Sequence, residues 1–327
     1  MTNLSSISRE GSSSGVDLPA PRCGLPPSLT PDVLDPVLVT ALAEDVRTGD
    51  ITTEHSVPVG ARARARLVAK APGVLAGLDA FVRAFVLCDG NVQVECLARD
   101  GDAVTVGQHL ATLSGSAAGL LIAERTALNV LQRLSGVATL TRRYVDAVAH
   151  VPGTRILDTR KTTPGLRLLE KYAVRCGGGE NHRIGLFDEA MIKENHLDLS
   201  GRDLESLVQH VRASIAPGTR ITAEARDADE SRAAVRGGAD VVLIDNIPAD
   251  QLVALCVELR ALAHELGHAV ELEASGGIHL GTVAGVAEAG VDRISIGALT
   301  HSAPALDLSL YLEPLAGSAS DAAGAPA

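Results

Sequence analysis

The stretch RITAEARDADESRAAVRGGADVVLIDN, Arg220 to Asn246, has the pattern of two strands joined by a helix. The runs ITAEA and VVLID are short and apolar, as expected for strands that are buried on both faces. Between them, ADESRAAVRGG has the composition of a helix and ends in two glycines. A helix between two such strands favours parallel pairing, with the helix outside the sheet.

The same alternation of strand-like and helix-like segments recurs from Thr154 onward. The strand-like runs are RILDTRK, AMIKENH, RITAEAR, DVVLIDN, VELEASGG and RISIGAL. Helix-like stretches lie between them, among them RDLESLVQHVRASI and ADQLVALCVELRALAHELG. We therefore predict an α/β barrel of about six to seven parallel strands, with a doubly wound open sheet as the alternative.

The residues before this region have a mixed pattern. A helix is expected in LTPDVLDPVLVTALAEDV, with Thr30 as its N-cap and Pro31 at its first position. The runs ARARLVAK, NVQVECLARDGDAV and HLATLSG alternate and are separated by turn residues, which indicates antiparallel strands. A further helix follows in AERTALNVLQRLSGVATLTRRYVDAVAH, with a break at Gly136.

These patterns predict an α/β protein in which a mixed α+β N-terminal domain is followed by the α/β barrel. We expect a disordered tail at 1–27, an N-terminal α+β sandwich domain at 28–137, a catalytic α/β barrel at 138–300, a return to the N-terminal domain at 301–315, and a second disordered tail at 316–327.

Composition narrows the class of protein. The net charge of −11 argues against a general nucleic-acid binder, which normally carries a basic face. The five cysteines are irregularly spaced and form no C-x-x-C, which fits a reducing cytoplasm rather than a disulfide framework. No apolar run approaches ~20 residues, the length of a membrane span. We predict a cytoplasmic protein without a membrane or nucleic-acid partner.

One motif suggests a different enzyme. HELGH, His264 to His268, matches the His-Glu-x-x-His signature of zinc proteases. However, the apolar stripe of its helix lies roughly 150° and 170° away from the two histidines, which therefore face solvent. Gly267 is expected to end the helix before His268. We therefore reject a zinc metalloprotease.

Charged residues collect where the predicted strands end, which is where barrels carry their active sites. The ends are occupied by Arg160 and Lys161, by Lys193, by Glu224 and Arg226, by Asp245 and Asn246, by Ser275, Gly276 and Gly277, and by Gly297. Each residue alone has a plainer interpretation, such as a strand-end salt bridge or a loop glycine. Lys193 is the strongest single indication of a functional site, because a lysine inside a barrel strand needs a partner or a function. Their recurrence at one end favours an active site.

The segment from Arg155 to His196 is locally basic. It carries eight Lys or Arg against six Asp or Glu, a net charge of +2 in a chain of −11. Converging cations suit a carboxylate or phosphate ligand. The neighbouring carboxylates of Glu224 and Asp245 suit Mg²⁺ shared with a diphosphate.

At these residues the chain resembles a known family. DTRKTTPGLRLLEKYAVRCGGGENHRIGLFDEAMIKENH closely resembles quinolinate phosphoribosyltransferases, type II phosphoribosyltransferases also called nicotinate-nucleotide diphosphorylases (carboxylating). EDVRTGDITT, AERTALNVLQRLSGVAT, LEASGGI and DRISIGALTHSAPALDLSL extend the resemblance over roughly Leu29 to Leu312. The resemblance implies that quinolinate and phosphoribosyl diphosphate give nicotinate mononucleotide, diphosphate and CO₂ with Mg²⁺, in NAD synthesis.

The resemblance also implies roles for individual residues. The quinolinate-binding residues would be Arg160, His182, Arg183 and Lys193, joined by Arg125 from the partner subunit of a homodimer or higher oligomer. The catalytic residues would be Lys161, Glu224 and Asp245, and the two acids would also contact Mg²⁺, directly or indirectly. Phosphoribosyl diphosphate would be bound by Lys161, Glu224, Asp245, Ser275, Gly276, Gly277 and Gly297.

One position departs from the family pattern, and two other activities stay open. Thr222 stands where members often have an additional acid, which either weakens metal or ribose contacts or has no effect if only Glu224 matters. A related enzyme acting on nicotinate, or a paralogue from molybdenum operons, is the alternative function. A lipoyl-type carrier is excluded for DGDAVTVGQHLATLSG, because no lysine lies between Lys70 and Lys161.

Overall fold

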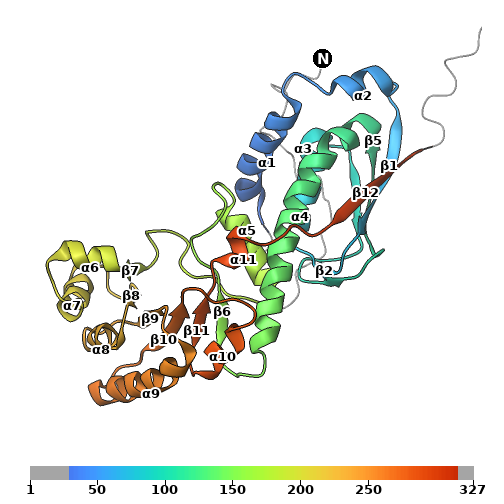
Figure 1. Cartoon of the computed structure of the whole chain (residues 1–327). Helices are drawn as coiled ribbons and strands as arrows, with labels where there is room; N and C mark the ends of the chain where they lie inside the picture. The colour runs from blue at the N-terminus through green and yellow to red at the C-terminus, as the bar shows by residue number, and fades with distance from the viewer. Residues whose placement is uncertain (1–28, 316–327) are drawn as a thin grey trace, which may run out of the picture. The chain divides into compact units, whose positions relative to one another are not determined.

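A computed structural model describes residues 29–315, so the tails predicted at 1–27 and 316–327 lie outside the described residues. The chain forms two compact units. The first unit contains the chain up to Thr139, Leu168–Gly177, and the residues from Ala303 on. The second unit contains Leu140–Arg167 and Gly178–Ser302 (Figure 1).

The first unit is built on an antiparallel sheet, as the alternating runs predicted. Its strands follow the order β12 (Leu308–Pro314), β1 (Arg62–Ala69), β5 (His109–Ser116) and β3 (Gln93–Cys96). Along β1 the arginines are exposed and the alanines and leucine between them are buried. A second small sheet pairs β2 (Gly73–Val74) with β4 (Ala103–Val104). Because β12 pairs with β1, the last described strand returns to the sheet formed early in the chain.

Helices complete the first unit. They are α1 (Pro31–Val46), α2 (Ile51–Ser56), α3 (Leu78–Cys88), the N-terminal part of α4 (Ala117–Val148) and most of α5 (Arg167–Cys176). Thr30 is the N-cap of α1 and Pro31 begins it, as predicted. Phe81 and Phe85 of α3 are fully buried and meet edge to face with ring centroids 5.0 Å apart. Two of the three phenylalanines therefore occupy the core of this unit.

The expected helix break at Gly136 is wrong. Helix α4 runs for 32 residues through that position. A Cβ at residue 136 would lie 2.1 Å from the carbonyl oxygen of Pro304, so the glycine serves a close backbone approach. Glycine in a helix costs only about 1 kcal/mol relative to alanine, which the surrounding packing offsets.

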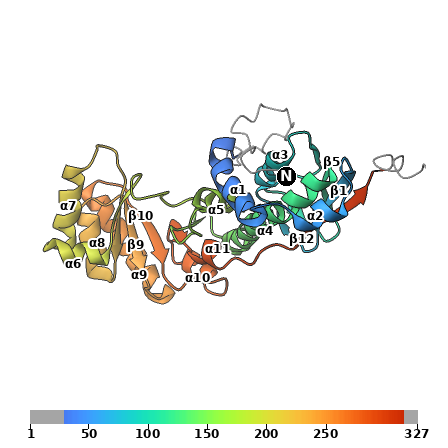
Figure 2. The same ribbon diagram turned by 90° about the horizontal axis from the view of Figure 1, so that it is seen from above.

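The second unit contains the parallel sheet. Its six strands follow the order β6 (Arg155–Leu157), β11 (Arg293–Ser295), β10 (Glu271–Ser275), β9 (Val241–Asp245), β8 (Ile221–Ala225) and β7 (Ala190–Ile192). The connecting helices are α6 (Glu194–Ser200), α7 (Leu204–Ser214), α8 (Ala228–Arg236), α9 (Ala249–Leu266), α10 (Val283–Glu288) and α11 (Ala298–His301). Figure 2 shows α7, α8 and α9 beside strands β9 and β10. The prediction of a parallel α/β barrel domain is confirmed.

The unit between Arg220 and Asn246 forms as its pattern predicted. Strand β8 pairs in parallel with β9, with Glu224 opposite Leu243. Asp227 caps helix α8 between them by accepting a hydrogen bond from the backbone N–H of Glu230. The helix buries Ala234 and Val235 against the sheet. The local signals therefore agree with the tertiary fold over this unit.

Two of the predicted strands are shorter than their sequence patterns. Strand β7 ends at Ile192, so Lys193 does not lie inside a strand but at the N-cap of α6, which contains His196. Strand β6 ends at Leu157, so Arg160 lies in the loop that follows. For β7 the reason is local: helix α6 begins where the strand was expected to continue, and the backbone N–H of Lys193 donates to His196 Nδ1 at 3.0 Å.

HELGH closes helix α9 as expected. Gly267 is the C-cap with a φ of 73°, a left-handed conformation that favours glycine. His264 is exposed, and His268 lies beyond the helix with Nε2 2.9 Å from the carbonyl oxygen of Val235. Within residues 29–315, no group of three or more His, Cys, Asp or Glu is arranged to hold a metal ion. The histidines therefore belong to an ordinary helix end.

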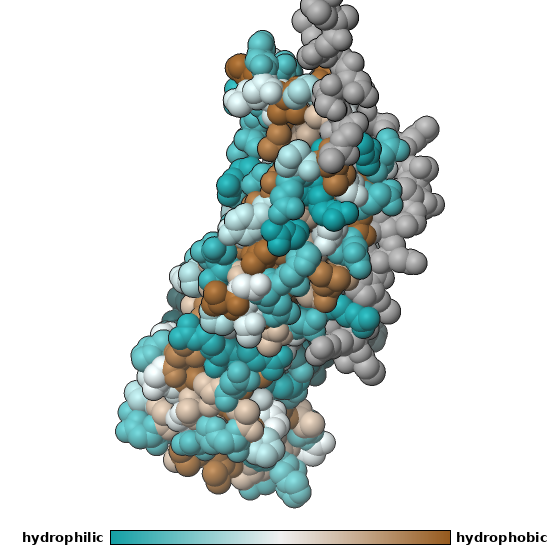
Figure 3. All heavy atoms as spheres, turned by 90° about the vertical axis from the view of Figure 1, so that its right-hand side faces the viewer, coloured by the Kyte–Doolittle hydropathy of each residue, from teal (hydrophilic) through white to brown (hydrophobic). Residues whose placement is uncertain are grey.

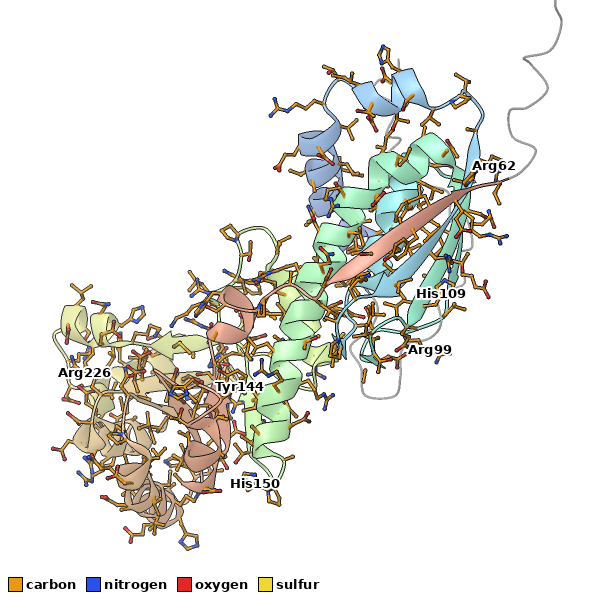
Figure 4. All side chains as sticks on the ribbon, turned by 45° about the vertical axis from the view of Figure 1, so that its right-hand side comes forward. Arg62, Arg99, His109, Tyr144, His150 and Arg226 are labelled. Atoms are coloured by element: carbon orange, nitrogen blue, oxygen red, sulfur yellow. The ribbon has the colours of Figure 1, made fainter. Side chains whose placement is uncertain are left out.

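Helix α4 contributes its C-terminal part to the second unit. Its Tyr144 is buried, and near the helix end His150 Nε2 lies 2.9 Å from Glu288 Oε1 of α10 (Figure 4). Hydrophilic and hydrophobic residues are intermixed over the face shown in Figure 3. None of the described helices is both long and apolar enough to span a membrane.

Candidate active site

A cavity of about 460 Å³ opens at the carboxyl ends of the parallel strands of the second unit. It is lined by residues that lie at or just after β6, β7, β8, β9, β10 and β11. Because the two edge strands β6 and β7 both contribute, the sheet curves around the cavity. Ten of the predicted site residues line it: Arg160, Lys161, His182, Arg183, Lys193, Glu224, Asp245, Ser275, Gly276 and Gly277.

Basic side chains occupy one side of the cavity. Arg160 and Arg183 both line it, and the Arg183 guanidinium also donates a hydrogen bond to the carbonyl oxygen of Glu189 at 3.2 Å. Burial, together with the nearby Arg160, lowers the pKa of Arg183. An arginine keeps its proton even so, since its pKa lies far above neutral pH. Two neighbouring cations facing one cavity favour an anionic ligand, which would relieve their repulsion.

Hydrogen bonds position the two loops that carry these cations. Arg167 Nε donates to the hydroxyl of Thr162 at 3.1 Å, in the loop after β6. Its Nη1 donates to the carbonyl oxygen of Ile184 at 3.3 Å, in the segment before β7. The loops of Arg160 and Arg183 are therefore tied to one side chain.

Carboxylates occupy another part of the wall. Glu224 comes from β8 and forms an ion pair with Lys193. Burial raises the pKa of Glu224, while its hydrogen bond to Lys193 lowers it and the neighbouring Glu194 raises it. Asp245 ends the adjacent strand β9 and accepts a hydrogen bond from Asn246 Nδ2 at 2.8 Å. The cavity therefore contains both cationic and acidic side chains, which meet at the ion pair of Lys193 and Glu224.

A glycine pair follows strand β10. Gly276 and Gly277 have φ of 91° and 59°, in the left-handed region that L-residues rarely adopt. A Cβ at Gly276 would lie 2.3 Å from Asn246 Oδ1 and 2.8 Å from Asp245 Oδ1. Glycine is therefore required both for the turn and for the room that Asp245 occupies. Backbone N–H groups in such turns commonly bind phosphate.

Lys161 is held by the segment after β11. Its backbone carbonyl accepts a hydrogen bond from the buried hydroxyl of Thr300 at 2.9 Å. A Cβ at Gly297 would lie 2.8 Å from Lys161 Cδ. Gly297 is absent from the cavity lining, but it borders the lysine that forms part of that lining.

The floor of the cavity contains a buried ion cluster. The side chains of His182 and Glu273 are 4% and 0% exposed, and His182 Nε2 lies 3.3 Å from Glu273 Oε1. Arg293 Nε lies 2.9 Å from Glu273 Oε2. Burial raises the pKa of Glu273, but His182, Arg293 and Ser295 together hold the pKa below its usual range.

Two predicted residues lie elsewhere. Arg125 is exposed on α4 within the first unit and is absent from the cavity lining. Arg226 follows β8 but pairs with Glu230 and Asp198, also away from the lining (Figure 4).

Four lining residues were missing from the predicted strand ends, namely Thr159, Met191, Leu243 and Ser295. Asn246 had been named at a strand end but was given no role. Each of the four stands two positions before a predicted site residue. Leu243 and Asp245 share a face of strand β9, so that spacing could have identified Leu243 from the sequence.

Thr222 lies outside the cavity lining and is fully buried. Its hydroxyl donates a hydrogen bond to Glu189 Oε1 at 2.5 Å. A carboxylate from the segment before β7 is therefore in contact with the position where an acid was expected.

Comparisons with known proteins agree over most of the chain. Residues 50–135 match the family model described as "Quinolinate phosphoribosyl transferase, N-terminal domain", and residues 137–311 match "Quinolinate phosphoribosyl transferase, C-terminal domain". A protein of Synechocystis named "Probable nicotinate-nucleotide pyrophosphorylase [carboxylating]" is 42% identical over 90% of this chain and 96% of its own length. The "Nicotinate-nucleotide pyrophosphorylase [carboxylating]" of Mycobacterium leprae is also 42% identical, over 83% of this chain and 94% of its own.

Solved structures are similar as well. NadC from Streptococcus pyogenes superposes with a TM-score of 0.82 at 37% identity, over 89% of this chain and 100% of that chain. The nicotinate-nucleotide pyrophosphorylase from Francisella tularensis gives a TM-score of 0.81 at 36% identity, over 88% of this chain and 98% of that chain.

Proposed function

Because the chain belongs to the quinolinate phosphoribosyltransferase family, we infer that it transfers a phosphoribosyl group from phosphoribosyl diphosphate to quinolinate. The products are nicotinate mononucleotide, diphosphate and CO₂, and the reaction is a step of NAD synthesis. The observation that carries the assignment beyond family membership is the convergence of cationic, acidic and glycine-rich strand ends on one cavity. Each part of that cavity suits one part of the two substrates.

The cationic side suits a dicarboxylate. Quinolinate carries two adjacent carboxylates, and Arg160, Arg183 and Lys193 supply charge around one space. Guanidinium groups bind carboxylates through paired hydrogen bonds, so two arginines select for two carboxylates. His182 lines the same side, and both of its ring nitrogens already face protein groups. We therefore assign the charge to the arginines and the lysine.

The acidic and glycine-rich parts suit phosphoribosyl diphosphate. Ser275, Gly276 and Gly277 would offer backbone N–H groups to the 5′-phosphate, and Gly297 would complete that end. Glu224 and Asp245 would hold Mg²⁺, since a pair of carboxylates on one wall fits a cation that shares its remaining ligands with substrate phosphate. When bound, Mg²⁺ neutralises charge on the leaving diphosphate.

The chain's own groups then account for the chemistry. Lys161 stabilises negative charge that develops on the diphosphate as the bond to ribose C1 breaks. The carboxylates of Glu224 and Asp245 stabilise the cationic character that C1 acquires. The quinolinate nitrogen attacks C1 and becomes cationic. The bond to the 2-carboxylate then breaks, CO₂ leaves, its electron pair remains on the ring carbon, and that carbon takes a proton from solvent. Orientation and electrostatics carry the reaction, without a covalent intermediate on the protein.

Arg125 would complete the site from a second copy of the chain. It is exposed on α4, and the family resemblance assigns it to the quinolinate pocket of the partner subunit. We therefore propose a homodimer or a higher oligomer with shared active sites.

The cysteines of the described residues are free, which supports the proposed cytoplasmic location.

Substrate discrimination tests the assignment. Purified protein is supplied with phosphoribosyl diphosphate, Mg²⁺ and either quinolinate or nicotinate, and nicotinate mononucleotide is measured. We expect product from quinolinate, with kcat/KM for nicotinate lower by at least about 100-fold, because a monocarboxylate leaves one cation without its partner. Comparable turnover of nicotinate would show that the cavity does not select a diacid.

A further inference from the structure

The buried acid Glu273 lies beneath the cavity and is absent from its lining. It belongs to β10, whose residues 271, 273 and 275 share one face, and Ser275 of that face lines the cavity. Burying a carboxylate costs several kcal/mol unless its partners compensate. Glu273 has two ion-pair partners: Arg293 Nε lies 2.9 Å from Oε2 and His182 Nε2 lies 3.3 Å from Oε1, contacts that are electrostatic and lack hydrogen-bond geometry.

The hydrogen bonds of His182 define where its ring proton lies. Nδ1 accepts a hydrogen bond from the backbone N–H of Arg183 at 2.8 Å. A ring nitrogen that accepts carries no hydrogen, so in the neutral imidazole the hydrogen is on Nε2. Nε2 is the atom that faces Glu273. A carboxylate on one side of an imidazole commonly selects the tautomer in this way.

This tautomer positions the backbone of Arg183. The backbone N–H of His182 is itself held by Asp158 Oδ1 at 2.9 Å, and Nδ1 then fixes the next N–H along the chain. From there the Arg183 side chain passes to the carbonyl oxygen of Glu189 and into the cavity wall. With a hydrogen on Nδ1 instead, two donors would face each other, and the backbone of Arg183 would have to move.

We propose that Glu273 is a positioning residue for the acid-binding side of the cavity. It holds His182 as the Nε2–H tautomer, and His182 holds the backbone from which Arg183 reaches the substrate carboxylate. The inference rests on the proposed function, since it assigns the contact of Arg183 to quinolinate. Phosphoribosyl diphosphate, bound at the glycine-rich side, would be unaffected.

A matched pair of variants separates this role from simple support of the barrel. Glu271 lies on the same strand face two residues earlier, and it pairs with Arg155, Arg220 and Arg293 without contacting His182. Glu273→Gln and Glu271→Gln each remove one buried or half-buried charge that Arg293 shares. Only the first removes the negative charge that faces His182 Nε2.

Steady-state kinetics with both substrates is the measurement. For Glu273→Gln we expect the KM for quinolinate to rise about tenfold, as for loss of one charge-assisted contact. The KM for phosphoribosyl diphosphate should stay within about twofold, and so should both KM values of Glu271→Gln. An unchanged quinolinate KM in Glu273→Gln, or an equal rise in Glu271→Gln, would overturn the proposal.

A double-mutant cycle tests the route through His182. In His182→Asn the amide oxygen can still accept from the N–H of Arg183, but the group facing Glu273 is lost. If Glu273 acts through His182, adding Glu273→Gln to His182→Asn should change the quinolinate KM by less than about twofold. Additive effects would contradict the route.

The tautomer is also measurable in the wild-type protein, which removes dependence on variants that fold poorly. Histidine labelled with ¹⁵N, with His182 assigned by its absence in His182→Asn, distinguishes Nδ1–H from Nε2–H rings. We expect the Nε2–H form at neutral pH, and the Nδ1–H form would overturn the proposal. This spectrum reports on the residue even if the wild type fails to turn over quinolinate, a failure that would count against the proposed function alone.

Discussion

Gly276 shows how a single residue sets the geometry of the site. Its φ of 91° strains any L-residue, and a Cβ there would meet the side chains of Asn246 and Asp245. Gly276→Ala should therefore raise the KM for phosphoribosyl diphosphate and lower kcat, by about tenfold in kcat/KM, because both the turn and Asp245 must move. The quinolinate Kd, measured by calorimetry, should change little.

Gly238 provides the control for Gly276. It also has a left-handed φ, of 82°, but nothing lies within 4 Å of its Cβ position, and it is away from the cavity lining. Gly238→Ala should lower stability by about 1 kcal/mol while leaving both kinetic constants unchanged. Equal kinetic losses in both variants would mean that the glycine pair has no special role.

Glu224 predicts a shift in the pH profile. Glu194 raises the pKa of Glu224, so Glu194→Gln should lower it. Since the proposed role of Glu224 requires the ionised form, which is lost as the pH falls through its pKa, the acid limb of kcat/KM for phosphoribosyl diphosphate should move to lower pH.

Asp198→Asn is the matched control for that shift. Asp198 lies on the same helix α6 but pairs with Arg226, outside the cavity lining. The acid limb of kcat/KM in Asp198→Asn should coincide with that of the wild type. An acid limb that stays in place in Glu194→Gln would assign that limb to another group.

At the residue scale, much of the cavity wall could be predicted from the sequence, whereas the buried Glu273 beneath it could not. Strand ends are visible as the last residues of apolar runs, so Glu224, Asp245 and Ser275 were placed from pattern alone. Glu273 was missed because an acid in the middle of a strand gives no sign of its direction or its partners. Its contacts come from residues about 20 and 90 positions away, which only the folded second unit brings together.

At the scale of elements, Gly136 shows that tertiary packing can outweigh the low helix propensity of a residue. Helix α4 passes through it because Pro304 needs the space, a contact across more than 160 residues that no local pattern reveals. Helix α6 gives the opposite case, since it begins within a run that alternation had assigned to a strand. Regular units such as β8–α8–β9 were predictable because local and tertiary preferences agree there.

Gly136→Ala should destabilise the protein by about 1–3 kcal/mol, because a Cβ 2.1 Å from the carbonyl oxygen of Pro304 forces the backbone apart. Gly285→Ala, in helix α10 with nothing within 4 Å of its Cβ position, should stabilise by up to about 1 kcal/mol. Denaturant unfolding measures both. If both variants changed the free energy of unfolding equally and in the same direction, helix propensity and not the close approach to Pro304 would determine the effect at position 136.

At the scale of the whole molecule, the proposed sharing of sites between subunits can be tested by complementation. Arg125→Ala removes a residue of the first unit, and Lys161→Ala removes one of the second. Each variant alone should be nearly inactive. When the two are mixed, unfolded and refolded together, about a quarter of the sites of a random dimer combine two intact contributions. If Arg125 served its own chain's cavity, the mixture would regain no activity.

Phosphoribosyl transfer and decarboxylation of quinolinate should occur together in the cavity of the second unit. Quinolinate labelled in its 2-carboxylate tests this coupling, with released CO₂ and nicotinate mononucleotide measured in the same reaction. We expect equal amounts of both, only when phosphoribosyl diphosphate and Mg²⁺ are present, and we expect both to be lost together in Lys161→Ala. Nucleotide formation without release of the label, or release of the label without phosphoribosyl diphosphate, would contradict it.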